Sequence, residues 1–82
     1  MQLDILTPDK KIFSGEVTSV QVPGTKGSFE VLNDHAPIIS TLEKGNVKVK
    51  SKDGVEIFTI SSGVIEVLKN KVTVLAESLI QE

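Results

Sequence analysis

The sequence has 82 residues, of which 39% are hydrophobic, a formal net charge of −2 at pH 7 and no cysteine. This length predicts a single domain over residues 1–82, because a second hydrophobic core would have too little chain to enclose it. The absence of cysteine excludes a disulfide framework, a thiolate nucleophile and a Cys-based zinc site. The slightly acidic charge argues against a general nucleic-acid binder, whose affinity depends on neutralising phosphates.

Membrane and export signals are also absent from the sequence. No run approaches the roughly 18 apolar residues that are needed to span a bilayer. The N-terminus, MQLDILTPDKK, lacks the basic start and the long apolar stretch of a signal peptide. We therefore expect a soluble intracellular domain.

The hydrophobic residues are mostly Val, Ile and Leu, with three Phe and no Trp or Tyr. β-Branched side chains pack well on pleated sheets and lose rotamer freedom in helices. Short apolar runs separated by Gly, Pro, Asn and Asp therefore predict strands and no helix. In chain order, the predicted strands cover residues 2–7, 16–22, 38–42, 46–50, 55–60, 64–68 and 72–77, with shorter extended pieces at 10–13 and 29–32.

The connections between these strands carry further signals. Ser14-Gly15 is predicted to be a turn, and the apolar positions then change phase between Val17 and Val20. This phase change predicts a bulge, or a bend from one sheet to another. Asp53-Gly54 predicts a tight hairpin, because it supplies the positive φ that such turns require. Residues 78–82 are left unassigned.

Seven or more short strands without a helix predict an all-β fold, either an antiparallel β-sandwich or a flattened barrel. The alternation of apolar residues along each strand indicates which side chains face the core. The predicted core consists of Leu3, Ile5, Phe13, Val20, Val22, Phe29, Val31, Ile39, Leu42, Val47, Val49, Ile57, Ile60, Ile65, Val67, Val72 and Val74.

Three features could suggest chemistry, and each has a simpler interpretation. Residues 24–28, GTKGS, fail the spacing of a phosphate-binding loop, and no predicted helix follows them. His35 next to Asp34 lacks a nucleophile, so it is expected to fix a loop or contact a partner. Ser61 and Ser62 lack the GxSxG pattern, and a metal site would need more than one His. We therefore predict no catalytic residue, no metal site and no cofactor.

Two surface features are ambiguous. Lys48, Lys50 and Lys52 are predicted to share one strand face, either as a solvated face that discourages aggregation or as a patch for an acidic partner. Val64 and Leu75 point away from the predicted core, and either a second sheet or a protein partner would cover them. The residues alone thus describe a small β-sandwich that binds another protein.

Several motifs are weak singly but specific as a set, because they occur together in one order and spacing. They are FSGEV at 13–17, VPGTxG at 22–27, HAPII at 35–39, LxxG at 42–45, SGVIEV at 62–67 and VTVLAE at 72–77. Together they cover nearly the whole chain. The set resembles the N-terminal domain of the epsilon subunit of the F-type ATP synthase, called delta in mitochondria.

This resemblance implies a fold and a role. The fold of that family is a ten-stranded β-sandwich. The implied role is that of a non-catalytic rotor subunit in the central stalk, which binds the gamma subunit and the polar loops of the c-ring. It would couple proton-driven rotation to ATP synthesis from a peripheral position on the cytoplasmic face of the bacterial inner membrane.

The resemblance also assigns two sets of contact residues by position. The residues that match the c-ring contact are Lys26, Gly27, Ser28 and Glu30. The residues that match the gamma contact are His35, Ser40 and Thr41. Two departures bear on these assignments: the family usually has Gly in place of Glu30, and Pro-Gly in place of Asn33-Asp34. Because Asn and Asp tolerate positive φ, the turn at 33–34 is expected to survive.

Most epsilon subunits continue into a C-terminal helical hairpin that inhibits ATP hydrolysis in many bacteria. The sequence ends at Glu82, so we expect no such inhibition from this chain. The alternative function is a stand-alone β-sandwich module that binds a ligand or peptide. A carbohydrate receptor is disfavoured because sugar sites usually need an exposed aromatic ring, and the chain has no Trp or Tyr.

Overall fold

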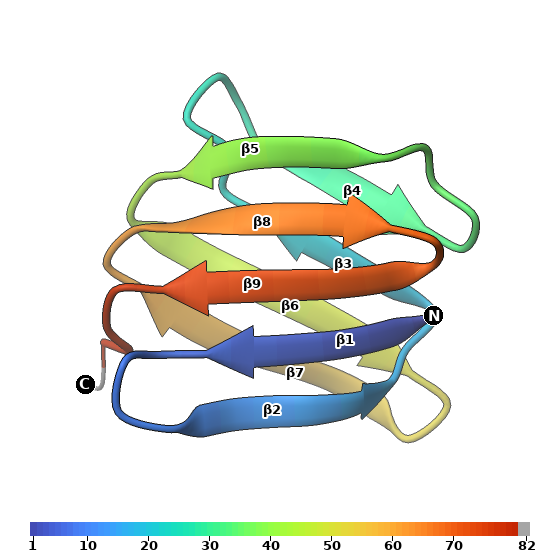
Figure 1. Cartoon of the computed structure of the whole chain (residues 1–82). Helices are drawn as coiled ribbons and strands as arrows, with labels where there is room; N and C mark the ends of the chain where they lie inside the picture. Colours follow the sequence, from blue (N-terminus) through green and yellow to red (C-terminus); the bar gives the residue numbers. More distant parts are fainter. Residues whose placement is uncertain (81–82) are drawn as a thin grey trace.

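A computed structural model describes residues 1–80, which form nine β-strands arranged as a two-layered sandwich (Figure 1). The prediction of an all-β sandwich is therefore confirmed. Of the tail left unassigned at 78–82, residues 81–82 lie outside the described residues. The strands are β1 (Gln2–Leu6), β2 (Lys11–Glu16), β3 (Ser19–Val22), β4 (Phe29–Leu32), β5 (Ile38–Leu42), β6 (Gly45–Ser51), β7 (Gly54–Ile60), β8 (Gly63–Leu68) and β9 (Lys71–Ala76).

The two layers are a five-stranded sheet in the order β2-β1-β9-β8-β5 and a four-stranded sheet in the order β4-β3-β6-β7. The strand pairs are antiparallel, as predicted, except that β1 and β9 run parallel. These two strands come from opposite ends of the chain, so no hairpin has to connect them. Their pairing places the first and last strands at the centre of the larger sheet.

The chain passes between the sheets at Val17-Thr18, where the sequence predicted a bulge or bend. The amide of Val17 donates to the carbonyl of Met1 in one sheet (2.9 Å), and the amide of Thr18 donates to the carbonyl of Lys50 in the other (2.8 Å). Residues 16–22 are therefore not one strand. The predicted turn at Ser14-Gly15 was also wrong, since both residues lie within β2 and pair with β1.

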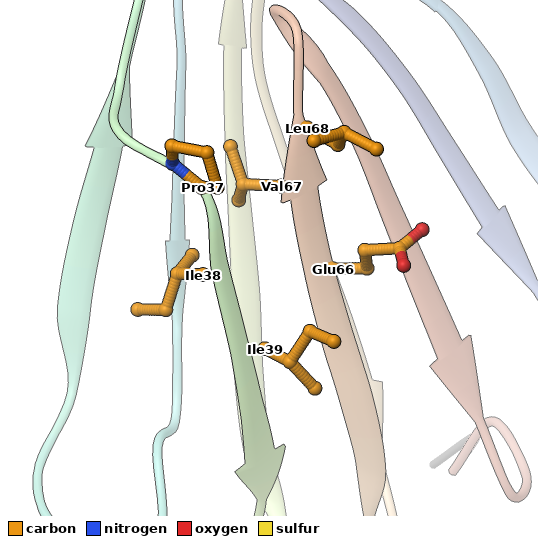
Figure 2. A pocket seen from close by; sticks show the side chains of 6 residues that line it. All are labelled: Pro37, Ile38, Ile39, Glu66, Val67 and Leu68. Carbon is orange, nitrogen blue, oxygen red and sulfur yellow. The ribbon is translucent and has the colours of Figure 1, made fainter.

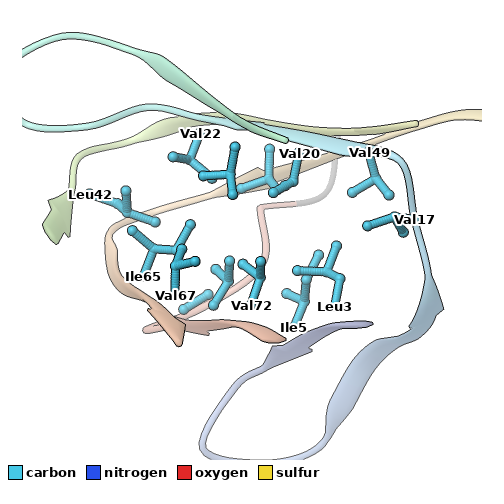
Figure 3. Packing of buried hydrophobic residues seen from close by; sticks show 14 of the residues in the cluster. Leu3, Ile5, Val17, Val20, Val22, Leu42, Val49, Ile65, Val67 and Val72 are labelled. Atoms are coloured by element: carbon cyan, nitrogen blue, oxygen red, sulfur yellow. The ribbon is translucent and has the colours of Figure 1, made fainter. Parts of the chain in front are cut away.

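The hydrophobic core lies between the two sheets, and most of the predicted core residues are found there (Figure 3). Phe13 and Phe29 are only partly buried at its margin. Phe13 packs edge-to-face against Phe58, with ring centroids 5.9 Å apart, and so joins β2 to β7. The buried hydrophobic residues are Met1, Leu3, Ile5, Val17, Val20, Val22, Val31, Leu42, Val47, Val49, Ile60, Ile65, Val67, Val72, Val74 and Ala76.

Two predicted core residues, Ile39 and Ile57, are on the outside, with exposed fractions of 74% and 57%. Successive side chains of a strand point to opposite faces, so residues three apart cannot share a face. Because Leu42 is buried, Ile39 must face outward. Ile57 must also face outward, because Ile60, three residues later on β7, is buried. The prediction placed both members of each pair in the core, and the alternation itself excludes this.

The loops gather at the two ends of the sandwich (Figure 1). Odd-numbered strands lead into one end, which we call the Gly27 end because it contains the β3–β4 loop. Even-numbered strands lead into the other, which we call the His35 end because it contains the β4–β5 loop. The surface of this protein therefore consists of the two outer sheet faces, these two ends and the sides formed by the edge strands β2, β5, β4 and β7.

Candidate functional site

The outer face of the five-stranded sheet carries a group of exposed apolar side chains on its neighbouring strands β5, β8 and β9. We call Ile39, Val64, Leu68 and Leu75 the apolar face; their exposed fractions range from 37% for Val64 to 74% for Ile39. Val64 lies directly opposite Leu75 in the β8–β9 register. The four-stranded sheet lies on the opposite side, so of the two alternatives for Val64 and Leu75, cover by a second sheet is excluded.

A groove of about 380 Å³ borders the apolar face where β5 begins and β8 ends. Figure 2 shows the residues that line it, with Ile39 on β5 next to β8. Glu66 is the only lining residue with a polar side chain. A concave apolar surface beside exposed apolar side chains is typical of a site that another protein covers. The lining residues are Pro37, Ile38, Ile39, Glu66, Val67 and Leu68.

His35 lies in the β4–β5 loop, two residues before the groove residue Pro37, and is half-buried. Its Nδ1 lies 2.8 Å from the carbonyl oxygen of Ala36, which can only accept, so Nδ1 donates in this hydrogen bond. Asp34 adopts a φ of 62°, and its amide donates to Oδ1 of Asn70 in the β8–β9 turn (2.9 Å). The expected survival of this turn without Pro-Gly is thus confirmed, and the loop is tied to the five-stranded sheet.

Ser40 and Thr41 lie on β5 but point to opposite faces. Ser40 pairs with the buried Ile65 and is half-buried, whereas Thr41 pairs with Val64 and is exposed. The hydroxyl of Thr41 is 2.8 Å from that of Thr25, so it contacts the β3–β4 loop at the Gly27 end. The structure therefore separates Thr41 from His35 by the length of β5.

The β3–β4 loop is a tight turn at the Gly27 end. Gly27 has a φ of 122°, and its amide donates to the carbonyl of Gly24 (2.9 Å). A Cβ at Gly24 would lie 2.6 Å from the carbonyl oxygen of Gly27, so only glycine fits there. Lys26, Gly27 and Ser28 are exposed together at the tip. Glu30 is apart from them, on β4, where it pairs with Gln21.

The predicted lysine stripe lies over the other sheet and is shorter than expected. Lys48 and Lys50 lie on β6, opposite Ile57 and Val55 of β7. Lys52 does not continue their row, because it is in the β6–β7 turn. Two cations therefore occupy the middle of the four-stranded sheet's outer face.

A polar network occupies the outer face of β1 and β2, beside the apolar face. The hydroxyl of Ser14 donates to Oδ1 of Asp4 (2.7 Å), Nε2 of Gln2 donates to the same oxygen (3.2 Å), and Nζ of Lys71 is 3.9 Å from Oδ2. These contacts, with the Ser14 hydrogen bond first, lower the pKa of Asp4 below its ordinary value. The larger sheet thus has a polar half and an apolar half.

At the His35 end the structure also reveals a buried ammonium group that the sequence analysis missed. The α-ammonium of Met1 donates to Oδ1 of Asn33 (2.8 Å), to Oε2 of Glu16 (3.1 Å) and to the carbonyl of Val17 (3.1 Å). No local pattern indicates these contacts, because they join residues up to 32 positions apart. They fasten the start of β1 to the crossing between the sheets.

The described residues hold no arrangement that would support catalysis at a metal. No three His, Cys, Asp or Glu side chains within residues 1–80 lie close enough together to bind a metal ion. Over the same range, no helix is long and apolar enough to cross a bilayer. What the surface offers is the apolar face, its groove and the two ends.

Comparisons with known proteins agree with one another. The family described as "ATP synthase, Delta/Epsilon chain, beta-sandwich domain" matches residues 1–82. The ATP synthase epsilon chain of Chlorobium limicola is 44% identical over 79 residues, which cover 95% of this chain and 90% of that protein. The epsilon chain of Salinibacter ruber is 43% identical over 88 residues and is a longer protein, of which this chain spans 59%.

Two solved structures share the fold at low sequence identity. A chain of the Euglena gracilis mitochondrial ATP synthase, in its OSCP/F1/c-ring part, matches 95% of this chain with a TM-score of 0.88 and 22% identity. A chain of the Tetrahymena thermophila mitochondrial ATP synthase, in its central stalk and c-ring, matches 98% with a TM-score of 0.84 and 16% identity. The matches cover 51% and 65% of those chains. The protein therefore belongs to the ATP synthase delta/epsilon chain family, of which it carries the β-sandwich domain.

Proposed function

We propose that this chain is a central-stalk, or rotor, subunit of an F-type ATP synthase. It binds the gamma subunit and the polar loops of the c-ring, turns with both and couples proton-driven rotation to ATP synthesis. Its relatives are named ATP synthase epsilon chains, and the similar solved structures are parts of ATP synthases. In this role the chain is not an enzyme and uses no cofactor.

The bacterial relatives support a location on the cytoplasmic face of the bacterial inner membrane. The chain is peripheral there and is held at the membrane through its partners. Family membership does not favour the alternative of a stand-alone ligand- or peptide-binding module.

The observation that carries the gamma contact is the apolar face. Soluble monomers rarely expose a large contiguous apolar patch unless it is functional, and Ile39 is 74% exposed on the edge strand β5 of this face. Covering an exposed side chain such as Ile39 or Leu75 contributes roughly 1.5–3 kcal/mol. His35 and Thr41 lie at the two ends of β5 and complete the polar rim of this surface.

The c-ring contact is proposed at the Gly27 end. Lys26, Gly27 and Ser28 form an exposed polar tip, which suits recognition of polar loops. Glu30 lies on β4, apart from this tip, and would extend the contact along that strand. Because this end and the apolar face are different surfaces, gamma and the c-ring can be bound at the same time.

The gamma contact is tested by titrating the purified chain with isolated gamma from the same source by calorimetry. We expect a stoichiometric complex that Leu75→Asp weakens by about 30-fold or more, because a carboxylate would be buried in an apolar interface. The matched control is Val55→Asp, a similarly exposed residue on the other sheet, which leaves the affinity unchanged. No complex at high micromolar concentration would refute the proposal and favour the stand-alone module.

The c-ring contact is tested in the reassembled enzyme with Lys26→Glu. We expect fewer protons pumped per ATP hydrolysed, while binding to isolated gamma stays unchanged. Lys52→Glu makes the same charge change at the His35 end and serves as the control. Equal effects of the two variants on proton pumping would refute the assignment of the Gly27 end to the c-ring.

A further inference from the structure

A single carboxylate sits within the apolar face of the five-stranded sheet. Glu66 is in the middle of β8, and its cross-strand neighbours are Ile39 on β5 and Thr73 on β9. Along β8, Val64 and Leu68 flank it on the same face, since they are two residues away on either side. Three of its four nearest neighbours on this face are thus apolar, and the fourth is an uncharged hydroxyl.

The described part of the chain does not neutralise this carboxylate. Residues 1–80 form two ion pairs, Met1 with Glu16 and Lys71 with Asp4, and neither includes Glu66. Lys71 is the nearest lysine by register, diagonal to Glu66 across the β8–β9 pair, but its ammonium lies 3.9 Å from Asp4. Glu66 is exposed, so water solvates its charge in the free protein.

A protein that covers the apolar face removes this water. Burial of an unpaired carboxylate is strongly unfavourable, whereas burial of a paired and hydrogen-bonded one is tolerated. A partner that buries Ile39, Val64 and Leu68 together is therefore favoured if it supplies a cation at Glu66. A guanidinium suits this position well, because it pairs with a carboxylate through two parallel hydrogen bonds.

We propose that Glu66 fixes the position at which gamma docks on this surface. The gamma segment that lies on the apolar face presents a basic side chain to Glu66 from within an otherwise apolar strip. This inference rests on the proposed function and adds the chemistry of the partner segment to it. The apolar side chains supply most of the affinity, and the ion pair sets the position along β8 at which gamma docks.

The test uses three variants of Glu66 in the same titration with isolated gamma. Glu66→Gln and Glu66→Leu each leave the partner's cation buried without an anion, and both are expected to weaken binding by about 30-fold or more. Glu66→Asp keeps the charge and is expected to retain most of the affinity. Glu56→Gln, an exposed glutamate on β7, is the matched control and leaves binding unchanged.

Glu66→Leu separates the inference from simple hydrophobic docking. If the apolar face binds gamma through apolar contacts alone, the added leucine strengthens the complex, and that result overturns the inference while the proposed function stands. Absence of any complex with the unchanged chain overturns both. Because Glu66 is exposed, thermal melts of the variants are expected to match the parent, which excludes unfolding as the cause of weaker binding.

The partner's cation is identified by charge exchange. Glu66→Arg is combined in turn with gamma variants in which one surface Arg or Lys is changed to Glu. We expect one of these pairs to recover at least about tenfold of the lost affinity, and that gamma residue is the partner of Glu66. Failure of every exchange to recover affinity counts against a specific ion pair.

Discussion

The outer faces of the two sheets both expose large apolar side chains, but they arrange them differently. On the five-stranded sheet these residues lie on three adjacent strands and surround one carboxylate. On the four-stranded sheet they lie on the two edge strands, with Leu32 on β4 and Val55 and Ile57 on β7. Lys48 and Lys50 occupy the strand β6 that lies between these edges.

The two faces therefore differ in the kind and position of the charged side chains that accompany their apolar residues. Lysines in the middle of a face keep it solvated and oppose association with another apolar surface. The five-stranded sheet has a single charge among its exposed apolar residues, the Glu66 carboxylate, and a cation on a partner can replace its lost solvation. We therefore propose the five-stranded sheet as the docking surface and the four-stranded sheet as the face that stays in water.

The largest expected effect comes from comparing two isoleucines on opposite faces of the five-stranded sheet. Ile65 is fully buried and Ile39 is 74% exposed. Ile65→Ala is expected to lower the free energy of unfolding by about 2–5 kcal/mol, because it leaves a cavity between the sheets. Ile39→Ala is expected to change it by less than about 0.5 kcal/mol and to weaken gamma binding instead. Urea unfolding measures the first effect and calorimetry the second.

Equal losses of stability in the two alanine variants would show that the outer face is covered by the protein's own chain. Loss of gamma binding in Ile65→Ala alone, at a temperature where that variant is folded, would place the docking surface elsewhere. Either result would break the distinction between the two faces of this sheet.

A smaller effect is expected when the four-stranded sheet is made to resemble the five-stranded one. Lys48→Leu would extend the apolar area from Ile57 across β6. Covering the new side chain in a dimer would contribute roughly 1.5–3 kcal/mol, so we expect concentration-dependent self-association. Sedimentation measures the mass, and Lys10→Leu at the Gly27 end is the control. A variant that stays monomeric at millimolar concentration would show that a central lysine is not what keeps this face solvated.

The smallest effect concerns the polar half of the five-stranded sheet. The pKa of Asp4 is lowered chiefly by the Ser14 hydroxyl, so the folded protein holds this carboxylate ionised more readily than the unfolded chain does. Its stabilising effect is present above the ordinary aspartate pKa of about 3.9 and disappears as the pH falls through the lowered pKa. In thermal melts, Asp4→Asn is expected to be less stable than the parent near neutrality and to converge with it below that range.

Ser14→Ala is the matched control for Asp4, since it removes the strongest hydrogen bond and keeps the carboxylate. It is expected to show a reduced version of the same pH dependence. A stability difference between Asp4→Asn and the parent that stays constant with pH would mean that the ionised form of Asp4 is not preferentially stabilised by folding.

Much of the fold follows from local pattern. β-Branched residues in alternation, punctuated by Gly, Pro, Asn and Asp, correctly indicated an all-β sandwich and the bend at Val17. The tight turn at Gly54 was also predictable. Its φ of 120° is a local requirement of the turn, and the Asp-Gly pair is typical of such turns because glycine adopts a positive φ readily. The strand at Lys11–Glu16 was only partly recognised, since Ser14-Gly15 resembles a turn until β1 pairs with it.

The candidate site was less predictable. Motif order indicated the family and the loops that carry Lys26 and His35. It did not show that Thr41 contacts the β3–β4 loop or that Glu30 lies apart from the Gly27 tip. These relations depend on which strands become neighbours, and pairing partners are chosen by contacts between distant parts of the chain.

The sequence by itself determined the fold class, most of the strand-forming segments, the tight turn at Asp53-Gly54 and the parity of each strand, because these depend on residues within a few positions of one another. Only the tertiary structure decided which apolar face stays exposed. That outcome depends on the parallel pairing of β1 with β9 and on the side of the larger sheet that the smaller sheet covers. Ile39 and Glu66 become neighbours on one surface because β5 pairs with β8 across 27 positions of sequence, a contact that no local interaction specifies.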